Sequence, residues 1–299
     1  MGHNHSHHSA AGKKLGFAIV INLLLTVAQV VGGVLSGSLS LIADALHNLS
    51  DAGAILVALV ARNIGNRTAS PNMTYGYKRA EVVGVLINST TLILVGIYLI
   101  YEAINKYSNP TPIDGWIVFW VAGIALLIDI VTALLAYKAG AKDNMNIRAA
   151  FIHNVSDALA SVVVIIAGIM IILYQLYIFD VIATIGISMY VIYHGVVLLR
   201  RSILIIMQAV PEGISIDAIT SSLMTVGDVR DVYHVHVWQL DDKKIFFEGH
   251  VLSDGEDPEL MKKEIRSVLK RKFNITHSTI ETVQKSSHRN RNMACNVRT

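Results

Sequence analysis

The sequence predicts an α-helical membrane protein with six transmembrane helices, followed by a small cytosolic α+β domain. Of its 299 residues, 53% are hydrophobic and only 16% are charged. The mean hydropathy of +0.50 is too high for a soluble protein of this length. Long apolar segments follow one another as far as residue 203, after which the composition becomes that of a soluble domain.

Six segments are long and apolar enough to cross a bilayer, which takes about 20 residues in a helix. They lie at 15–35, 39–61, 80–104, 116–137, 149–173 and 176–199. Only the stretch 174–177 separates the fifth segment from the sixth, and one continuous helix there would reverse the topology downstream. Because the first segment is long enough to span by itself, we expect it to remain as an anchor and not to be cleaved as a signal peptide.

The distribution of positive charge predicts that both termini lie in the cytoplasm. With six spans, the inner segments hold almost all the Lys and Arg residues near the spans, and the outer loops hold only Lys106. This asymmetry follows the positive-inside rule. The inner set is Lys13, Lys14, Arg62, Arg67, Lys78, Arg79, Lys138, Lys142, Arg148, Arg200 and Arg201.

A pentapeptide occurs twice within these spans. His-Asn-Leu-Ser-Asp at 47–51 recurs as His-Asn-Val-Ser-Asp at 153–157. Residues four apart share one face of a helix, so each copy presents an imidazole nitrogen beside a carboxylate oxygen. Two such helices face to face offer four ligands for a divalent transition metal, a number and mixture that suit zinc best. The ligands would be His47, Asp51, His153 and Asp157.

A purely structural explanation of this repeat is unfavourable, because burying carboxylates in the membrane costs free energy. An ionised Asp near the centre of a bilayer costs roughly 2.5–3.5 kcal/mol, so such residues usually face a cavity or a partner. If each histidine only bonded its own helix, two membrane carboxylates would have no purpose. The sequence therefore predicts a metal site inside the bilayer.

Other polar residues in the spans are weaker candidates. Asp44, three residues before His47, lies near the same helical face and would support a ligand or line the pathway. For most of the others, hydrogen bonds between helices are the better explanation. These are Asn22, Gln29, Glu81, Asn88 and Asp129.

The remaining composition excludes several classes of site. Cys295 is the only cysteine, so neither an intrachain disulfide nor a multi-cysteine metal site can form. A net charge of +3 gives no support for nucleic-acid binding. The N-terminal tail, 1–14, has the composition of a metal-collecting tract, although exposed histidines also occur without metal. Its histidines are His3, His5, His7 and His8.

After the membrane segment, 15–203, residues 204–285 predict a compact module with the order α-β-β-α-β. We expect a helix at 214–226 ended by Gly227, strands at 229–240 and 245–252, a helix capped by Asp257 with Pro258 at its first position, and a strand at 277–283. The helices should cover one side of the sheet. The tail 286–299 is polar and basic, and we expect it to be disordered.

These motifs together resemble the cation diffusion facilitators of bacteria, and the resemblance covers nearly the whole chain. It rests on six spans, the paired His-x-x-x-Asp, the loop Tyr-Gly-Tyr-Lys-Arg-Ala-Glu at 75–81, and His-Val-Trp at 236–238. The resemblance implies a homodimeric exporter in the inner membrane that exchanges cytosolic zinc, or a related divalent metal, for protons. The His/Asp ligands resemble the zinc-preferring branch.

The chain departs from the family pattern in two places. The loop 62–79 lacks the histidine of members that have an additional metal site there, so that site is not expected. Where the family often has His-Asp-Leu-His-Val-Trp, the first histidine is replaced by Tyr233. The cytosolic candidates for regulatory zinc are His234, His236, His250, His277 and Glu281. A solvated sheet face would explain these residues equally well, and the sequence leaves both alternatives open.

Other functions remain to be separated from export. A metal-gated channel or a membrane metal sensor would use the same residues. A membrane metalloenzyme is less well supported, because a catalytic zinc needs an open coordination position and four ligands already fill the shell. No HExxH, GxSxG or P-loop pattern accompanies the repeat. The expected partners are therefore divalent metal ions, protons, a second copy of the chain and membrane lipid.

Overall fold

The computed structural model describes residues 23–138, 145–255 and 257–284, so the predicted tails at 1–14 and 286–299 lie outside it. The chain divides into two compact units. One contains the membrane helices, and the other contains the C-terminal domain together with Val60–Val83. Each unit is described by itself.

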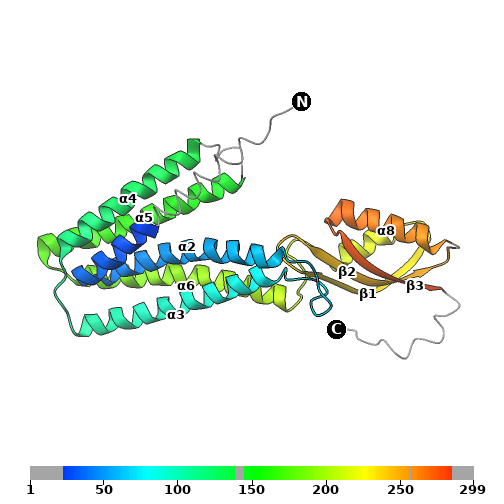
Figure 1. Ribbon diagram of the computed structural model, residues 1–299, viewed down its shortest axis with the longest axis horizontal. Helices are drawn as coiled ribbons and strands as arrows, with labels where there is room; N and C mark the ends of the chain where they lie inside the picture. Colours follow the sequence, from blue (N-terminus) through cyan, green and yellow to red (C-terminus); the bar gives the residue numbers. More distant parts are fainter. Residues whose placement is uncertain (1–22, 139–144, 256, 285–299) are drawn as a thin grey trace. The chain divides into compact units, whose positions relative to one another are not determined.

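The first unit is helical, as predicted (Figure 1). Five helices in the described residues are long and apolar enough to cross a membrane. A shorter apolar helix, Leu23–Ser36, covers the described part of the first predicted span. The five are α2 (Leu39–Gly65), α3 (Ala80–Ser108), α4 (Gly115–Lys138), α5 (Met145–Tyr174) and α6 (Ile178–Ile206).

The helices extend beyond the predicted spans, because polar residues that follow an apolar segment can continue the same helix. Helix α6 continues through Arg200 and Arg201 to Ile206, and arginine is a good helix former. Helix α3 continues to Ser108, so Lys106 lies in its last turn. The expectation that Lys106 belongs to an outer loop was therefore wrong.

The predicted break between the fifth and sixth spans is confirmed. Helix α5 ends at Tyr174, and Gln175 has a left-handed conformation with φ of 55°. Its N–H donates to the carbonyl of Ile171 at 2.9 Å. A left-handed residue of this kind is a common way to end a helix. Helix α6 then starts at Ile178.

The bundle has a buried apolar core that includes Leu41 and Val164, and it also exposes many large apolar side chains on its outside. Small residues lie inside, such as Ala122 and Ala125 with no exposed surface, whereas Leu127 of the same helix is 65% exposed. Helices α4 and α5 run side by side (Figure 1) and approach closely at two glycines. A Cβ on Gly168 would lie 3.4 Å from the carbonyl oxygen of Gly115. Small residues at helix contacts and large apolar residues outside are expected where lipid is the solvent.

The C-terminal domain has the predicted order α-β-β-α-β. Its elements are α7 (Ile216–Leu223), β1 (Val229–Gln239), β2 (Ile245–Ser253), α8 (Pro258–Phe273) and β3 (His277–Gln284). The sheet order is β1-β2-β3, with β1 antiparallel and β3 parallel to the central strand. The parallel pair needs a crossover connection, which α8 supplies.

Local signals set the helix ends of this domain. Asp257 caps α8, as predicted, and its side chain accepts from the N–H groups of Glu259 and Leu260 at 3.0 and 3.1 Å. Helix α7 is shorter than predicted. It starts after its cap Ser215 and ends at Leu223, before the expected Gly227, because the chain turns there to bury Val226 in the core.

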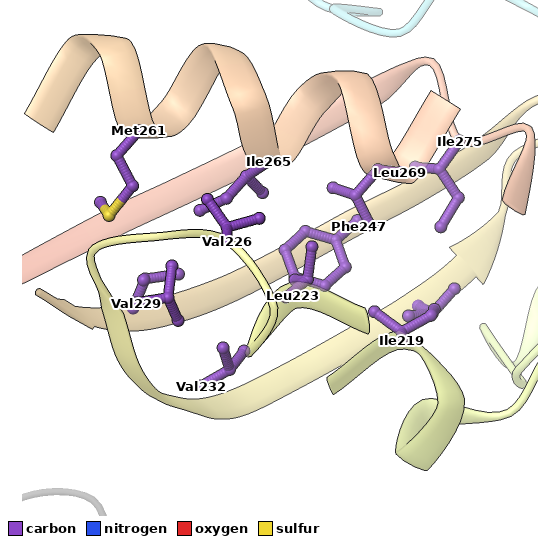
Figure 2. Close-up of a cluster of buried hydrophobic side chains, with 12 residues drawn as sticks. Ile219, Leu223, Val226, Val229, Val232, Phe247, Met261, Ile265, Leu269 and Ile275 are labelled. Atoms are coloured by element: carbon purple, nitrogen blue, oxygen red, sulfur yellow. The ribbon is translucent and has the colours of Figure 1, made fainter. Parts of the chain in front are cut away.

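One hydrophobic core lies between the sheet and its two helices. Figure 2 shows Ile265 and Leu269 of α8 pointing toward Phe247 of β2, with Ile219 and Leu223 of α7 beside it. All five side chains are fully buried. Both helices therefore cover one side of the sheet, and the residues that alternate with the core positions face the other side.

Candidate metal site in the membrane

Helices α2 and α5 bring the two pentapeptides face to face. Each imidazole lies between both carboxylates. The Nε2 atom of His47 is 3.3 Å from Oδ1 of Asp157 and 3.7 Å from Oδ2 of Asp51. The Nε2 atom of His153 is 3.3 Å from Oδ2 of Asp51 and 3.5 Å from Oδ2 of Asp157. The closest contacts therefore cross between the helices.

These separations suit one tetrahedral ion. Zinc binds nitrogen and oxygen at 2.0–2.2 Å, so neighbouring ligand atoms in a tetrahedral shell lie about 3.3–3.6 Å apart. The four nitrogen–oxygen distances, from 3.3 to 3.7 Å, closely match those edges. Among the described residues, the group with three ligand atoms within 4.8 Å of one another is His47, Asp51 and Asp157. His153 is not part of that group, and Asp157 faces His47 with Oδ1 but His153 with Oδ2, so the structure brings three of the predicted ligands together and the fourth contacts both carboxylates beside them.

The ligand atoms are poorly satisfied by the protein itself. Both ring nitrogens of His47, Oδ2 of Asp51 and Oδ1 of Asp157 are buried and have no hydrogen-bond partner among the described residues. Leaving one buried polar group unsatisfied typically costs about 1–3 kcal/mol. Several such atoms converging on one point indicate a place for a cation or protons.

The four predicted ligand residues differ in how exposed their side chains are. We call the end of the bundle at the start of α2, the end of α3 and the start of α6 the distal end. On each ligand helix, the residue nearer the distal end is buried, with side chains 8% exposed for His47 and 9% for Asp157. The residue farther away is more open, 38% for Asp51 and 47% for His153. The exposed fractions of the ligand side chains therefore fall toward the distal end on both helices, while a cavity between α5 and α6 extends from His47 as far as Phe179 at the start of α6.

Asp44 lies one helical turn from His47 toward the distal end and is almost completely buried. Its Oδ2 accepts from Nε2 of Gln29 at 2.6 Å, and Oε1 of Gln29 accepts from Nδ2 of Asn48 at 3.0 Å. Asp44 is thus held by the helix Leu23–Ser36. The other carboxylate oxygen, Oδ1, has no hydrogen-bond partner among the described residues.

Hydrogen bonds between helices, predicted for most of the polar residues outside the repeat, are confirmed for several of them. Gln29 bonds two residues of α2, as described above. Asn88 of α3 donates to Ser50 of α2 at 3.2 Å. Asp129 of α4 accepts from Ser161 of α5 at 3.3 Å. Asn22 lies outside the described residues.

The sequence did not reveal two aromatic neighbours of the site. Tyr190 of α6 contacts His47 edge to face, with ring centroids 5.8 Å apart, and His194 lies 4.5 Å from Tyr190. Tyr190 and His47 also line a mostly apolar cavity of about 520 Å³ between α5 and α6. Helical periodicity placed Tyr190 on α6, but only the packing of α6 against α2 brings it to the site.

The structure separates the cytosolic candidates into two places. His234, at a bulge in β1 with φ of 51°, has its ring 4.6 Å from that of His236 and 4.9 Å from that of His250. Nε2 of His250 is 3.5 Å from Oε2 of Glu281. His277 pairs with Phe246, four positions along β2 from His250, and therefore lies apart from this group.

Comparison with known proteins shows which family the chain belongs to. A model of the cation efflux transmembrane domain matches residues 15–207, and a model of the cytoplasmic domain of cation efflux proteins matches 211–282. The chain belongs to the cation efflux family, which is the cation diffusion facilitator family. It is a membrane exporter of metal cations.

Individual relatives match over almost their full length. A zinc transporter ZitB of Pectobacterium atrosepticum is 35% identical, covering 94% of this chain and 88% of the relative. A cadmium, cobalt and zinc/H(+)-K(+) antiporter of Bacillus subtilis is 31% identical, covering 99% and 96%. The metal-bound C-terminal domain of the CzcD transporter of Cupriavidus metallidurans is 25% identical, with a TM-score of 0.22, and covers 23% of this chain and 99% of that domain.

Proposed function

We propose that this protein exports zinc from the cytoplasm in exchange for protons, and that His47, Asp51, His153 and Asp157 bind the ion in transit. The observation that carries the proposal is the set of four nitrogen–oxygen distances, 3.3–3.7 Å, around a point where buried ligand atoms lack partners. The names of the relatives, a zinc transporter and a cadmium, cobalt and zinc antiporter, support zinc and proton exchange.

Exchange follows from competition between the ion and protons for the same atoms. Ligands must be deprotonated to bind metal, so binding releases protons and protonation expels the ion. Imidazole is suited to this because its unperturbed pKa of about 6.5 lies between cytosolic pH and a mildly acidic exterior. Two positive charges leaving against an inside-negative potential cost about 4.6 kcal/mol per 100 mV, and one entering proton returns about half of that. The pH gradient or the zinc gradient supplies the rest.

Alternating access gives the direction of transport. In the proposed topology both termini and the C-terminal domain lie in the cytoplasm of a bacterial inner membrane, and the distal end faces outward. The more exposed pair, Asp51 and His153, then faces the cytoplasm. This is the state in which an exporter receives its ion.

The proposed division of labour follows the predicted boundaries. Residues 15–203 carry the ion, and 204–285 form a cytosolic module that joins two copies of the chain as a homodimer. Zinc on His234, His236 and His250, with Glu281 close by, would draw the modules together. A channel, a sensor or an enzyme is less well supported, because the relatives that match nearly the whole chain are named as a transporter and an antiporter.

Zinc flux in vesicles tests the proposal. Purified protein in sealed vesicles should move zinc in a saturable way that is driven by a pH gradient, and Asp157→Ala should reduce this flux to background. The matched control is Ser156→Ala, since the Ser156 hydroxyl only bonds the carbonyl of Ile152 in its own helix at 3.1 Å. Full flux in a well-folded Asp157→Ala protein would contradict the site assignment, and ionic conductance without proton coupling would indicate a channel.

A further inference from the structure

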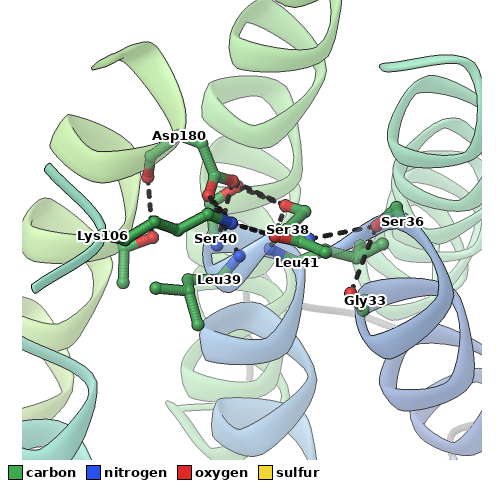
Figure 3. A network of polar contacts seen from close by, with 10 residues as sticks. Gly33, Ser36, Ser38, Leu39, Ser40, Leu41, Lys106 and Asp180 are labelled. Atoms are coloured by element: carbon green, nitrogen blue, oxygen red, sulfur yellow. Dashed lines mark hydrogen bonds and ion pairs between the residues drawn. The ribbon is translucent and has the colours of Figure 1, made fainter. Parts of the chain in front are cut away.

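A second buried charged cluster lies at the distal end of the bundle (Figure 3). Its centre is Asp180, in the first turn of α6, which has no exposed surface. The carboxylate accepts four hydrogen bonds from the start of α2. They come from the hydroxyls of Ser38 and Ser40 at 2.6 and 2.7 Å, and from the N–H groups of Leu39 and Ser40 at 3.0 and 3.2 Å.

The negative charge of Asp180 is balanced by a lysine from a third helix, α3. Lys106, in the last turn of α3, has its Nζ atom 3.7 Å from Oδ2 of Asp180 and also donates to the carbonyl of Gly37. Its side chain is only 9% exposed. The start of α2, with its free N–H groups and positive dipole end, also favours a carboxylate. One cluster, the distal clamp of Ser38, Leu39, Ser40, Lys106 and Asp180, therefore joins α2, α3 and α6.

The distal clamp lies on the side of the proposed metal site where the ligand side chains are more buried. His47 is seven residues from Ser40 on the same continuous helix, and two helical turns correspond to about 10.5 Å. The ligands that face away from the distal end are open, whereas the ligands that face it are buried. The ligand pair nearer the clamp is thus the more buried one, and the cavity between α5 and α6 extends from His47 to Phe179, the neighbour of Asp180.

We propose that the distal clamp is the outer gate of the transport cycle, and this proposal rests on the proposed function as an alternating-access exporter. An ion held by His47 and Asp157 leaves only if the helices that bury it separate toward the distal end. The charged hydrogen bonds that join α2 to α3 and α6 there must then break. In the closed state, the buried ion pair favours the inward-facing structure. When the gate opens, water replaces the lost partners of Asp180 and Lys106.

Cysteine labelling from outside tests the gate. Cys295→Ser removes the only cysteine, and Ala43→Cys then places a small thiol one turn deeper than Ser40 on the same face of α2. Ala43 is 2% exposed, so a membrane-impermeant maleimide should not reach it at rest. During zinc export it should be labelled. Thr111→Cys, in the exposed loop after α3, is the control that should react under both conditions.

Matched variants of Lys106 connect the labelling with the clamp. Lys106→Met keeps the unbranched shape and most of the length of the side chain but removes the charge, and it should raise the resting labelling rate of Ala43→Cys about tenfold, the effect of losing one charged hydrogen bond. Lys106→Arg keeps the charge and should leave the thiol protected. If the Lys106→Met protein does not fold, labelling of Ala43→Cys during export still decides the question.

Failure of the gate and failure of the proposed function give different results. If zinc flux is normal while Ala43→Cys stays protected throughout, the clamp is a permanent anchor and the gate is refuted. If the unmodified protein moves no zinc, the proposed function is refuted. In that case the gate is still judged by the resting labelling of Lys106→Met against Lys106→Arg, and equal rates would overturn it.

Discussion

The proposed metal site and the distal clamp are two charged clusters in one helical bundle, and they differ in how many of their buried polar atoms have hydrogen-bond partners. Asp180 accepts four hydrogen bonds and has a lysine as its counter-ion. At the metal site, atoms of His47, Asp51 and Asp157 are buried without a hydrogen-bond partner among the described residues. A cluster whose polar atoms all have hydrogen-bond partners stabilises one arrangement of helices. A cluster whose buried polar atoms lack partners can bind a ligand that supplies them.

Removing one carboxylate from each cluster should give the largest difference in stability between the two. Asp180→Ala leaves Lys106 buried without its counter-ion and should lower the free energy of unfolding by roughly 3–5 kcal/mol. Asp51→Ala removes a poorly satisfied membrane carboxylate and should change it by less than about 0.5 kcal/mol while abolishing flux. Thermal unfolding of both variants without metal checks this. Equal losses of stability would show that Asp51 is structural.

Zinc should stabilise the folded protein by binding at the proposed metal site and not at the distal clamp. At a free zinc concentration of about 100 times the dissociation constant, binding to the native state adds about 2.7 kcal/mol. The unmodified protein and Lys106→Arg should both show this rise in unfolding temperature, since neither changes a ligand. Asp157→Ala should not show it. A rise of the same size in Asp157→Ala would mean that zinc binds elsewhere, and the cytosolic histidines would be the first place to look.

Replacing a nitrogen ligand should change selectivity and pH dependence. His47→Asp substitutes a hard oxygen for a borderline-soft nitrogen and adds negative charge, so larger or harder cations should compete better against zinc, with cadmium and manganese as the test ions. An unperturbed carboxylate has a pKa of about 3.9 and imidazole about 6.5, so the variant should still bind metal at pH 5–6, where protonation of the imidazole weakens binding in the unmodified protein. Competition and pH profiles of flux in vesicles measure both effects. Unchanged selectivity would mean that geometry outweighs ligand type.

The smallest effect is expected from the cytosolic histidines. Replacing His234, His236 and His250 together by Ala should reduce flux by about twofold to tenfold at low zinc and leave it unchanged at high zinc, because a sensor only biases the equilibrium between states. Zinc-dependent compaction of the full chain, followed by scattering, should be lost in the same variant. His277→Ala is the control, since His277 lies apart from the other three. Unchanged compaction would leave the domain as a structural cap.

Local patterns were sufficient to predict most of the architecture. Hydropathy located the spans, and the turn at 174–177 was correctly placed although few polar residues mark it. Alternating residues, Asp257 and Pro258 predicted the α-β-β-α-β order. The boundaries were less accurate, as at Leu223 and Ile206, because the end of a helix depends on how the next segment packs. The spacing of the pentapeptide also specified which face of each helix carries ligands.

The sequence by itself determined that two His-x-x-x-Asp motifs lie on membrane helices, since side-chain spacing of four is a local property of a helix. Only the tertiary structure decided that the shortest contacts cross from His47 to Asp157 and from His153 to Asp51. Only the tertiary structure paired Asp180 with Ser40, 140 residues apart, and placed Lys106 beside Asp180 as its buried counter-ion. A bulge at His234 likewise decided which cytosolic histidines meet. These contacts depend on the depth, rotation and register of packed elements, which are set by the fit of distant surfaces and not by any pattern along the chain.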